Sequence, residues 1–209
     1  MDNISAAQNR PGRPKSEAKH SAILNSAGTL FLRDGYDKTS MDAVAREAGV
    51  SKQTVYSHFS GKEDLFRACI RDKVEEYGLD MDRLSSGLPL REALTMVGNQ
   101  FMELLADEKV MAMHRLLAAE CLTHKHLTQS FFEIGPRTTM MNLARYLRDH
   151  RGPGRLDMDD HEQAAQMFFA LLKQMYFTQR LFDLRPPMSA SERHQHVDDM
   201  VGVFLKIYG

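Results

Sequence analysis

A run of polar side chains stands in the segment SKQTVYSHF, which spans Ser51 to Phe59. The side chains carry hydroxyl, amide, imidazole and ammonium groups, which can reach base edges and phosphates in the major groove of double-stranded DNA. At helical spacing they point outward, because Val55 and Phe59 occupy the opposite face. The predicted DNA contacts of this segment are Ser51, Lys52, Gln53, Thr54, Tyr56, Ser57 and His58.

Two short helices separated by Gly49 are expected to position this row. Ala45, Gly49 and Val55 have the spacing of a helix-turn-helix, in which a small residue allows close crossing, glycine allows a tight turn and a branched side chain anchors the second helix. The alternative is a plain helical hairpin whose polar face meets only water. The side chains expected to face inward are Met41, Val44, Ala45, Ala48, Val50, Val55 and Phe59.

Apolar residues recur at intervals of three and four along almost the whole chain, which predicts an all-α fold of about nine helices. Capping boxes are expected at Thr39 with Asp42 and at Ser60 with Glu63, and a kink at Gly135-Pro136. Further helix starts are expected after Thr39, Ser51 and Ser60. The longer predicted helices cover residues 17–33, 90–106, 108–122, 126–150, 160–182 and 190–208.

The composition is that of an ordinary soluble globular chain. It has 209 residues, of which 43% are hydrophobic and 26% charged, and no apolar run is long enough for a membrane span. The N-terminal sequence has no export pattern, and the two cysteines are spaced as small buried hydrophobic residues, so we expect a cytoplasmic protein. The net charge is −1, but residues 1–62 carry +3 and the remainder −4, which makes the N-terminal end the candidate for an anionic partner.

The segment from Ala22 to Phe66 resembles the N-terminal domain of TetR-family bacterial transcriptional regulators. The resemblance rests on the run F...GYDKTSMDAVAREAGVSKQTVYSHFSGKEDLF, which covers about a quarter of the chain. It implies a transcriptional regulator rather than an enzyme. It also implies a flexible basic arm at 1–15, a three-helix DNA-binding domain at 16–62, and a larger helical ligand-binding and dimerisation domain at 63–209.

By this resemblance, Thr39 and Lys62 would contact phosphate. Tyr56 and His58 would contact the sugar-phosphate backbone or nearby bases. For His58, a hydrogen bond to a neighbouring backbone group is an equal alternative.

The expected base readers lie at the start of the second short helix. Gln53 could bind adenine and Lys52 guanine through two hydrogen bonds, each contact being worth about 1–3 kcal/mol of discrimination. The sequence does not decide among Lys52, Gln53 and Thr54. In the basic arm, Arg13 and Lys15 belong to the segment RPGRPK, which is similar to minor-groove hooks, and a solvated tail is the alternative.

One helix-turn-helix offers too few contacts for selective binding, so a homodimer is expected. In the TetR family the last two long helices form the dimer interface, and both are rich in apolar residues here. The alternative is that both helices are wrapped inside one subunit. The predicted interface residues are Phe169, Leu172, Tyr176, Val197, Met200, Val201 and Phe204.

The C-terminal part carries the candidate effector site. Twelve of the fourteen methionines lie at or beyond Met81, and methionine-rich interiors can repack around apolar guests of different shapes. The run FFEIGPRTTMMNLARYLRD resembles the AefR-like branch, which implies a hydrophobic or amphipathic small-molecule effector. The predicted pocket residues are Phe101, Met102, Leu105, Met113, Leu117, Phe131, Met140, Met141 and Phe168.

No motif supports catalysis, a cofactor or a metal. The pairs His124/His126 and His194/His196 lack a carboxylate or cysteine cluster that would complete a tetrahedral site. Phosphate loops, nucleophile elbows and HExxH are missing from the sequence. The function expected is a repressor that is released from a pseudo-palindromic operator by a hydrophobic effector. The alternatives are an activator, a regulator controlled by a protein partner, a metal sensor, and a carrier or enzyme on a helical scaffold.

Overall fold

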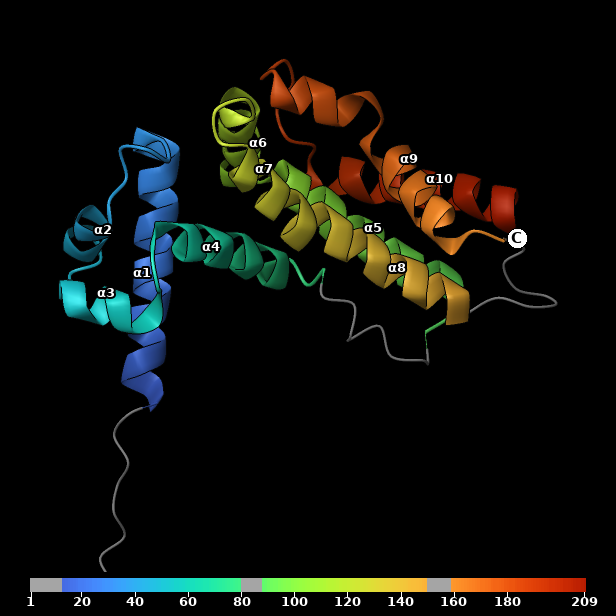
Figure 1. Cartoon of the computed structure of the whole chain (residues 1–209). Helices are drawn as coiled ribbons and strands as arrows, with labels where there is room; N and C mark the ends of the chain where they lie inside the picture. The colour runs from blue at the N-terminus through green and yellow to red at the C-terminus, as the bar shows by residue number, and fades with distance from the viewer. Residues whose placement is uncertain (1–12, 80–87, 150–158) are drawn as a thin grey trace, which may run out of the picture. The chain divides into compact units, whose positions relative to one another are not determined.

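The computed structural model describes residues 13–79, 88–149 and 159–209, and all regular structure in these ranges is helical (Figure 1). The prediction of an all-α fold is confirmed, and the described ranges hold nine helices when α7, η2 and α8, which follow one another without a break, are counted as one. The helices are α1 (Arg13–Asp34), α2 (Met41–Glu47), α3 (Lys52–His58), α4 (Lys62–Glu76), α5 (Leu90–Ala106), α6 (Glu108–Glu120), α7 (Lys125–Phe132), the π-helical turn η2 (Glu133–Arg137), α8 (Thr138–Asp149), α9 (His161–Leu181) and α10 (Ala190–Tyr208).

The chain divides into two compact units, Met1–Cys69 and Ile70–Gly209, and the division falls inside α4. The domain boundary predicted after residue 62 lies at the start of the same helix and stays a prediction. Helix α1 begins at Arg13, so the backbone of residues 13–15, assigned from the sequence to a flexible arm, is helical.

An aromatic cluster forms the centre of the smaller unit. Phe31 of α1 lies 5.3 Å from Phe66 of α4, and Tyr36 lies 5.7 Å from each of them, measured between ring centroids. The edge-to-face pairs with Phe66 have the geometry that aromatic quadrupoles favour. This cluster fastens the turn between α1 and α2 to α4.

Local capping begins each of the short helices. Ser51 accepts a hydrogen bond from the amide of Thr54 at the start of α3, as the sequence predicted. The predicted cap of α2 was wrong by one residue: Ser40 accepts from the amide of Ala43, whereas Thr39 is turned inward. Before α4, Ser60 pairs with a different carboxylate from the one predicted, because its amide and hydroxyl both donate to Asp64.

The turn between α2 and α3 depends on a residue with positive φ. Gly49 has φ of 64°, a conformation that costs energy for any residue with a β-carbon. The amide of the following Val50 donates to the carbonyl of Ala45 and closes the turn. The glycine of the predicted helix-turn-helix therefore has the backbone role expected of it.

In the larger unit, α5 packs against α10 and α8 packs against α9, and side chains from all four helices make one apolar core (Figure 1). Gly98 allows α5 and α10 to approach closely, since a β-carbon there would lie 2.7 Å from Val197. None of the helices in the described ranges is long and apolar enough to cross a membrane.

Two interruptions mark the long helices of this unit. At Gly135-Pro136, where a kink was predicted, the chain forms the π-helical turn η2, which accommodates the proline between α7 and α8. The second was not predicted: Gln174, in the middle of α9, has φ of 35° and ψ of −140°, so α9 consists of two helical pieces joined at a kink.

Candidate nucleic-acid interface and effector site

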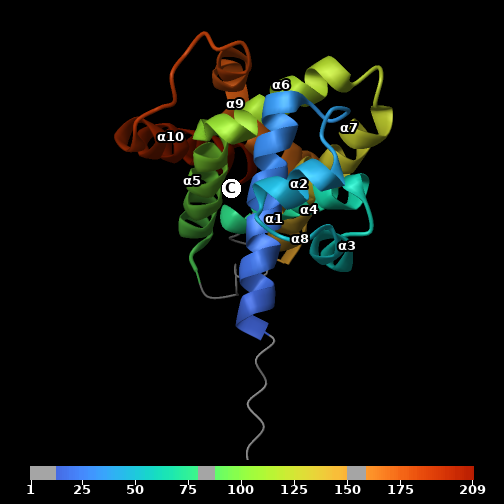
Figure 2. The same cartoon turned by 90° about the vertical axis from the view of Figure 1, so that its left-hand side faces the viewer.

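Helix α3 has one exposed polar face, and two buried apolar side chains hold its other face in the smaller unit. Val55 is completely buried and Phe59, at the end of the helix, is nearly so. The opposite face is exposed, including 49% of the surface of Tyr56. Figure 2 shows α3 beside α2 in the smaller unit. The remaining predicted contacts are exposed at Ser51, Lys52, Gln53 and Ser57 and partly buried at Thr54 and His58.

The serine and threonine hydroxyls at α3 are engaged within the helix. Ser51 and Thr54 share a hydrogen bond of 2.8 Å between their hydroxyls, and Ser57 donates to the carbonyl of Thr54 at 2.7 Å. Within the described ranges, the side-chain amide of Gln53 and the hydroxyl of Tyr56 make no hydrogen bond to the protein. Gln53 and Tyr56 are therefore the groups of α3 with unused hydrogen-bonding capacity on its exposed face.

Lys52 forms an exposed ion pair with α2. Its ammonium lies 2.8 Å from one carboxylate oxygen of Asp42 and 3.0 Å from the other, and 5.9 Å from the ring centroid of Tyr56. The hydrogen bond that Lys52 donates to Asp42 raises the pKa of Lys52. Lys52 must exchange this carboxylate for a phosphate or a base before it can contact DNA.

Removing the charge of this carboxylate tests that competition. We expect Asp42→Asn to strengthen DNA binding about threefold at low salt, because it frees Lys52 and removes an anion close to the phosphates. The measurement is fluorescence anisotropy on duplex DNA at several salt concentrations. Glu162→Gln, an exposed change at the first turn of α9, is the control. Equal affinities for Asp42→Asn and the wild type would show that Lys52 is not held back by its partner.

Thr39 and Lys62 are engaged by the protein itself. Thr39 is buried, and its hydroxyl donates to the carbonyl of Gly35 at 2.8 Å. The Lys62 ammonium donates to the carbonyl of Tyr36 at 2.8 Å and lies 4.3 Å from the centre of its ring. Both side chains thus hold the turn between α1 and α2, and a phosphate contact at either position remains a prediction.

His58 packs within an aromatic group and is only partly exposed. Its ring lies 5.5 Å from His20 and 6.2 Å from Phe59. The backbones of Arg13 and Lys15 belong to α1, but their side chains lie outside the described part of the structure. The predicted minor-groove contact of the arm therefore stays a prediction.

The predicted pocket residues separate into two groups. Phe101, Met102, Leu105, Leu117 and Phe168 are buried in the larger unit. The partly exposed group, which a ligand could reach with less rearrangement, is Met113, Phe131, Met140 and Met141.

A half-buried histidine joins three helices beside these residues. The ring of His114 in α6 lies 5.0 Å from Phe131 of α7 and 5.3 Å from Phe177 of α9, both edge-on. The ammonium of Lys173 lies 5.9 Å from the ring centroid of Phe177. Sequence reasoning missed His114 and Lys173, although a lysine within the otherwise apolar run of α9 was a visible signal.

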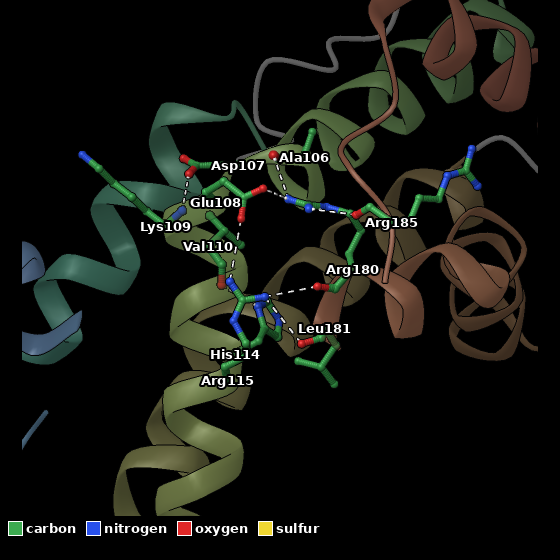
Figure 3. Close-up of polar contacts among 10 residues, drawn as sticks. All are labelled: Ala106, Asp107, Glu108, Lys109, Val110, His114, Arg115, Arg180, Leu181 and Arg185. Atoms are coloured by element: carbon green, nitrogen blue, oxygen red, sulfur yellow. Dashed lines mark hydrogen bonds and ion pairs between the residues drawn. The ribbon is translucent and has the colours of Figure 1, made fainter. Parts of the chain in front are cut away.

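Sequence reasoning also missed Arg180, which is fully buried near the end of α9. Its guanidinium donates to Glu108 at 2.6 Å and to the carbonyls of Ala106 and Arg185 at 3.3 and 3.2 Å (Figure 3). Arg115 donates to the carbonyl of Arg180 at 3.1 Å and lies 3.7 Å from Glu108. This network fastens the end of α9 to the junction between α5 and α6.

The adjacent Asp107 connects the same junction to the end of α4. The hydroxyl of Tyr77 donates to it at 2.7 Å and Lys73 lies 3.7 Å away. Burial and this hydrogen bond raise the pKa of Tyr77. Burial opposes ionisation of Asp107, but the hydrogen bonds from Tyr77 and from the Lys109 amide outweigh it and hold the pKa of Asp107 below its ordinary value.

Most of the residues predicted for the dimer interface lie in the core of the larger unit. Only Met200 is partly exposed, and the others contribute to packing within the chain. The apolar side chains that α9 and α10 leave exposed are Met167, Met175, Val203 and Ile207. The buried residues of the predicted set are Phe169, Leu172, Tyr176, Val197, Val201 and Phe204.

The histidine pairs do not assemble a metal site. No group of three or more His, Cys, Asp or Glu side chains able to hold a metal ion occurs among the residues that the structure describes. His196 is partly buried, and its Nε2 lies 2.9 Å from the carbonyl oxygen of Leu172, close to the kink in α9.

The two parts of the chain match two family descriptions. Residues 23–69 match the "Bacterial regulatory proteins, tetR family" and residues 92–209 match the "AefR-like transcriptional repressor, C-terminal domain". Among curated proteins, the regulator YdeS of Bacillus subtilis is 44% identical over 55 residues, or 26% of this chain. That match spans only 28% of the length of YdeS.

Solved structures resemble the chain over most of its length. The Flavonoid-responsive Regulator FrrA is 32% identical, with 92% of this chain and 97% of that chain covered and a TM-score of 0.72. A TetR-family transcriptional regulator from Mesorhizobium loti is 27% identical, with 94% and 100% covered and a TM-score of 0.77. The helix-turn-helix geometry and these matches agree, and the chain belongs to the TetR family, whose members are transcriptional regulators and not enzymes.

Proposed function

We propose that this chain is a ligand-responsive transcriptional repressor that binds operator DNA as a homodimer. The observation that carries the DNA-binding part is the exposed row on α3, where Gln53 and Tyr56 keep unused hydrogen-bonding groups above the buried anchor Val55. In a helix-turn-helix, the residues at the start of the second helix reach base edges in the major groove. Such a regulator would act in the cytoplasm, where the chromosome is.

Dimerisation follows from the number of contacts that selective binding needs. One α3 reaches few bases, so two copies related by a twofold axis would place their recognition helices about 34 Å apart, on successive turns of the duplex. An interface through α9 and α10 is supported by the exposed apolar side chains of these helices, Met167, Met175, Val203 and Ile207. The buried residues of these helices would support that interface from within each subunit.

Release by an effector would be a shift between two states of the dimer. DNA favours the state in which the two α3 helices match the groove spacing, and the effector favours the other. The coupling is reciprocal, so DNA must weaken effector binding by the same factor by which the effector weakens DNA binding. The name of the related protein FrrA, a flavonoid-responsive regulator, supports a small-molecule effector.

The test is a titration of the purified protein against the DNA upstream of its own gene. We expect tight binding that resists random competitor DNA and weakens steeply with salt, since each phosphate contact releases counterions. A reporter fused to the same DNA should rise when the gene is deleted. A fall would identify an activator, and equal binding to random DNA would contradict an operator at this place.

Met113→Glu tests the effector site separately from the DNA-binding face. Met113 of α6 is partly exposed in the larger unit, and a carboxylate there would disfavour an apolar ligand. We expect unchanged operator binding and at least a tenfold higher effector concentration for half-release. Gln129→Glu, an exposed change on α7, is the control. A wild-type response from Met113→Glu would remove Met113 from the site.

A further inference from the structure

One group of side chains inside the larger unit combines aromatic rings with a cation. The ring of His114 in α6 lies 5.0 Å from the ring of Phe131 in α7 and 5.3 Å from the ring of Phe177 in α9, measured between ring centroids. Lys173, one turn before Phe177, directs its ammonium toward the same ring at 5.9 Å. Three helices that lie apart in the sequence therefore place a cation beside a group of aromatic rings.

Lys173 has no anionic partner within the described ranges. Its side chain is half-buried, and no carboxylate of those residues forms an ion pair or a hydrogen bond with it. Burial lowers the pKa of Lys173. Burial also lowers the pKa of His114, and the charges of Lys173 and Arg115 act in the same direction. A partly desolvated ammonium without a counter-ion costs free energy, and an anion would offset that cost.

His114 supplies a hydrogen-bond acceptor at the same place. Its Nδ1 lies 2.8 Å from the carbonyl of Val110, which can only accept, so Nδ1 carries the proton. Burial lowers the pKa of His114 and keeps the ring neutral. Its Nε2 then has a free lone pair for a donor group, and the ring is held in position by Phe131 and Phe177.

We propose that Lys173 and His114 bind the polar end of an aromatic organic anion, with the anionic group on Lys173, a hydroxyl or N–H group on His114, and the ring against Phe131 and Phe177. This narrows the effector from any hydrophobic molecule to an amphipathic anion, and as an effector assignment it rests on the function proposed above. The binding itself requires neither DNA nor dimerisation. The kink at Gln174, next to Lys173, places the anion contact at the irregular point of α9.

Two fluorescent probes test the proposal in the full-length protein without DNA. 8-Anilinonaphthalene-1-sulfonate and N-phenyl-1-naphthylamine share one aromatic skeleton and one N–H group, but only the first carries an anionic sulfonate. We expect the wild type to bind the sulfonate about tenfold more tightly than the neutral dye, since charge-assisted hydrogen bonds are stronger than neutral ones. Fluorescence titration at fixed salt measures both dissociation constants.

Variants identify the residues responsible. Lys173→Met keeps the length and packing of the side chain and should reduce the preference for the sulfonate to about twofold or less, whereas Lys173→Arg should keep it. Lys109→Met is the matched control, because Lys109 is exposed and its side chain points away from His114 (Figure 3). His114→Phe keeps the ring and should weaken both dyes by the same factor, about fivefold, because both lose one hydrogen bond.

Three results would overturn the proposal. They are equal affinities of the two dyes for the wild type, an unchanged preference in Lys173→Met, and the same loss of preference in Lys109→Met. Operator binding, measured in parallel, distinguishes a failure of the proposed anion site from a failure of the proposed regulator function. A protein that binds DNA but shows no sulfonate preference would retain the proposed function and lose only the anion site.

Discussion

Replacing Arg180 with methionine is expected to lower the free energy of unfolding of the larger unit by about 3 kcal/mol. The guanidinium is completely buried and provides the hydrogen bonds of the carbonyls of Ala106 and Arg185, which methionine leaves without a donor. Ala106 ends α5, so the variant also removes a cation from a helix C-terminus. Urea unfolding followed by circular dichroism measures the loss.

The partner of Arg180 provides the control for charge alone. Glu108 keeps 59% of its side chain exposed, and glutamine still offers an oxygen acceptor to the buried guanidinium, so Glu108→Gln should cost less than about 1 kcal/mol. Arg180→Lys should fall between the two variants, because one ammonium cannot reach three acceptors in the plane of a guanidinium. If Arg180→Met and Glu108→Gln were equally stable, the ion pair and not the backbone hydrogen bonds would be the important interaction.

Substitutions on α3 are expected to separate affinity from sequence preference. Tyr56→Ala should weaken binding to operator and scrambled DNA alike, by about tenfold, because its hydroxyl would contact the sugar-phosphate backbone. Gln53→Ala should weaken the operator by about 1–3 kcal/mol and leave scrambled DNA almost unchanged, because its amide would read a base. Fluorescence anisotropy with both duplexes at one salt concentration gives the two ratios.

Gln129→Ala removes an equally exposed amide from the larger unit and should change neither ratio. Equal losses on both duplexes for Gln53→Ala would exclude Gln53 as a base reader and favour Lys52 or Thr54. A variant at Tyr56 that lost affinity only for the operator would assign the base contact to Tyr56 instead.

The sequence determined the helices and the turn that joins α2 to α3. The predicted limits 90–106 and 190–208 are confirmed to the residue, and the cap at Ser51 is present. These features depend on side chains within about four residues of one another, so local spacing is sufficient to predict them. The error at Thr39 has the same origin: Thr39 and Ser40 can both cap a helix, and only packing of the turn against α4 placed Thr39 inside.

The tertiary structure decided which faces of α9 and α10 are internal and what the charged residues of α9 do. Both helices are apolar around more than one face, so the sequence could not distinguish core residues such as Leu172 and Phe204 from exposed apolar residues such as Val203. Arg180 and Lys173 both lie in α9, yet Arg180 has two acceptors in the distant segment 106–108 and a third at Arg185, whereas Lys173 has no counter-ion among the described residues. The physical reason is that burial and polar pairing depend on partners far apart in the sequence, such as Arg180 and the carbonyl of Ala106, 74 positions away, which only the folded chain brings together.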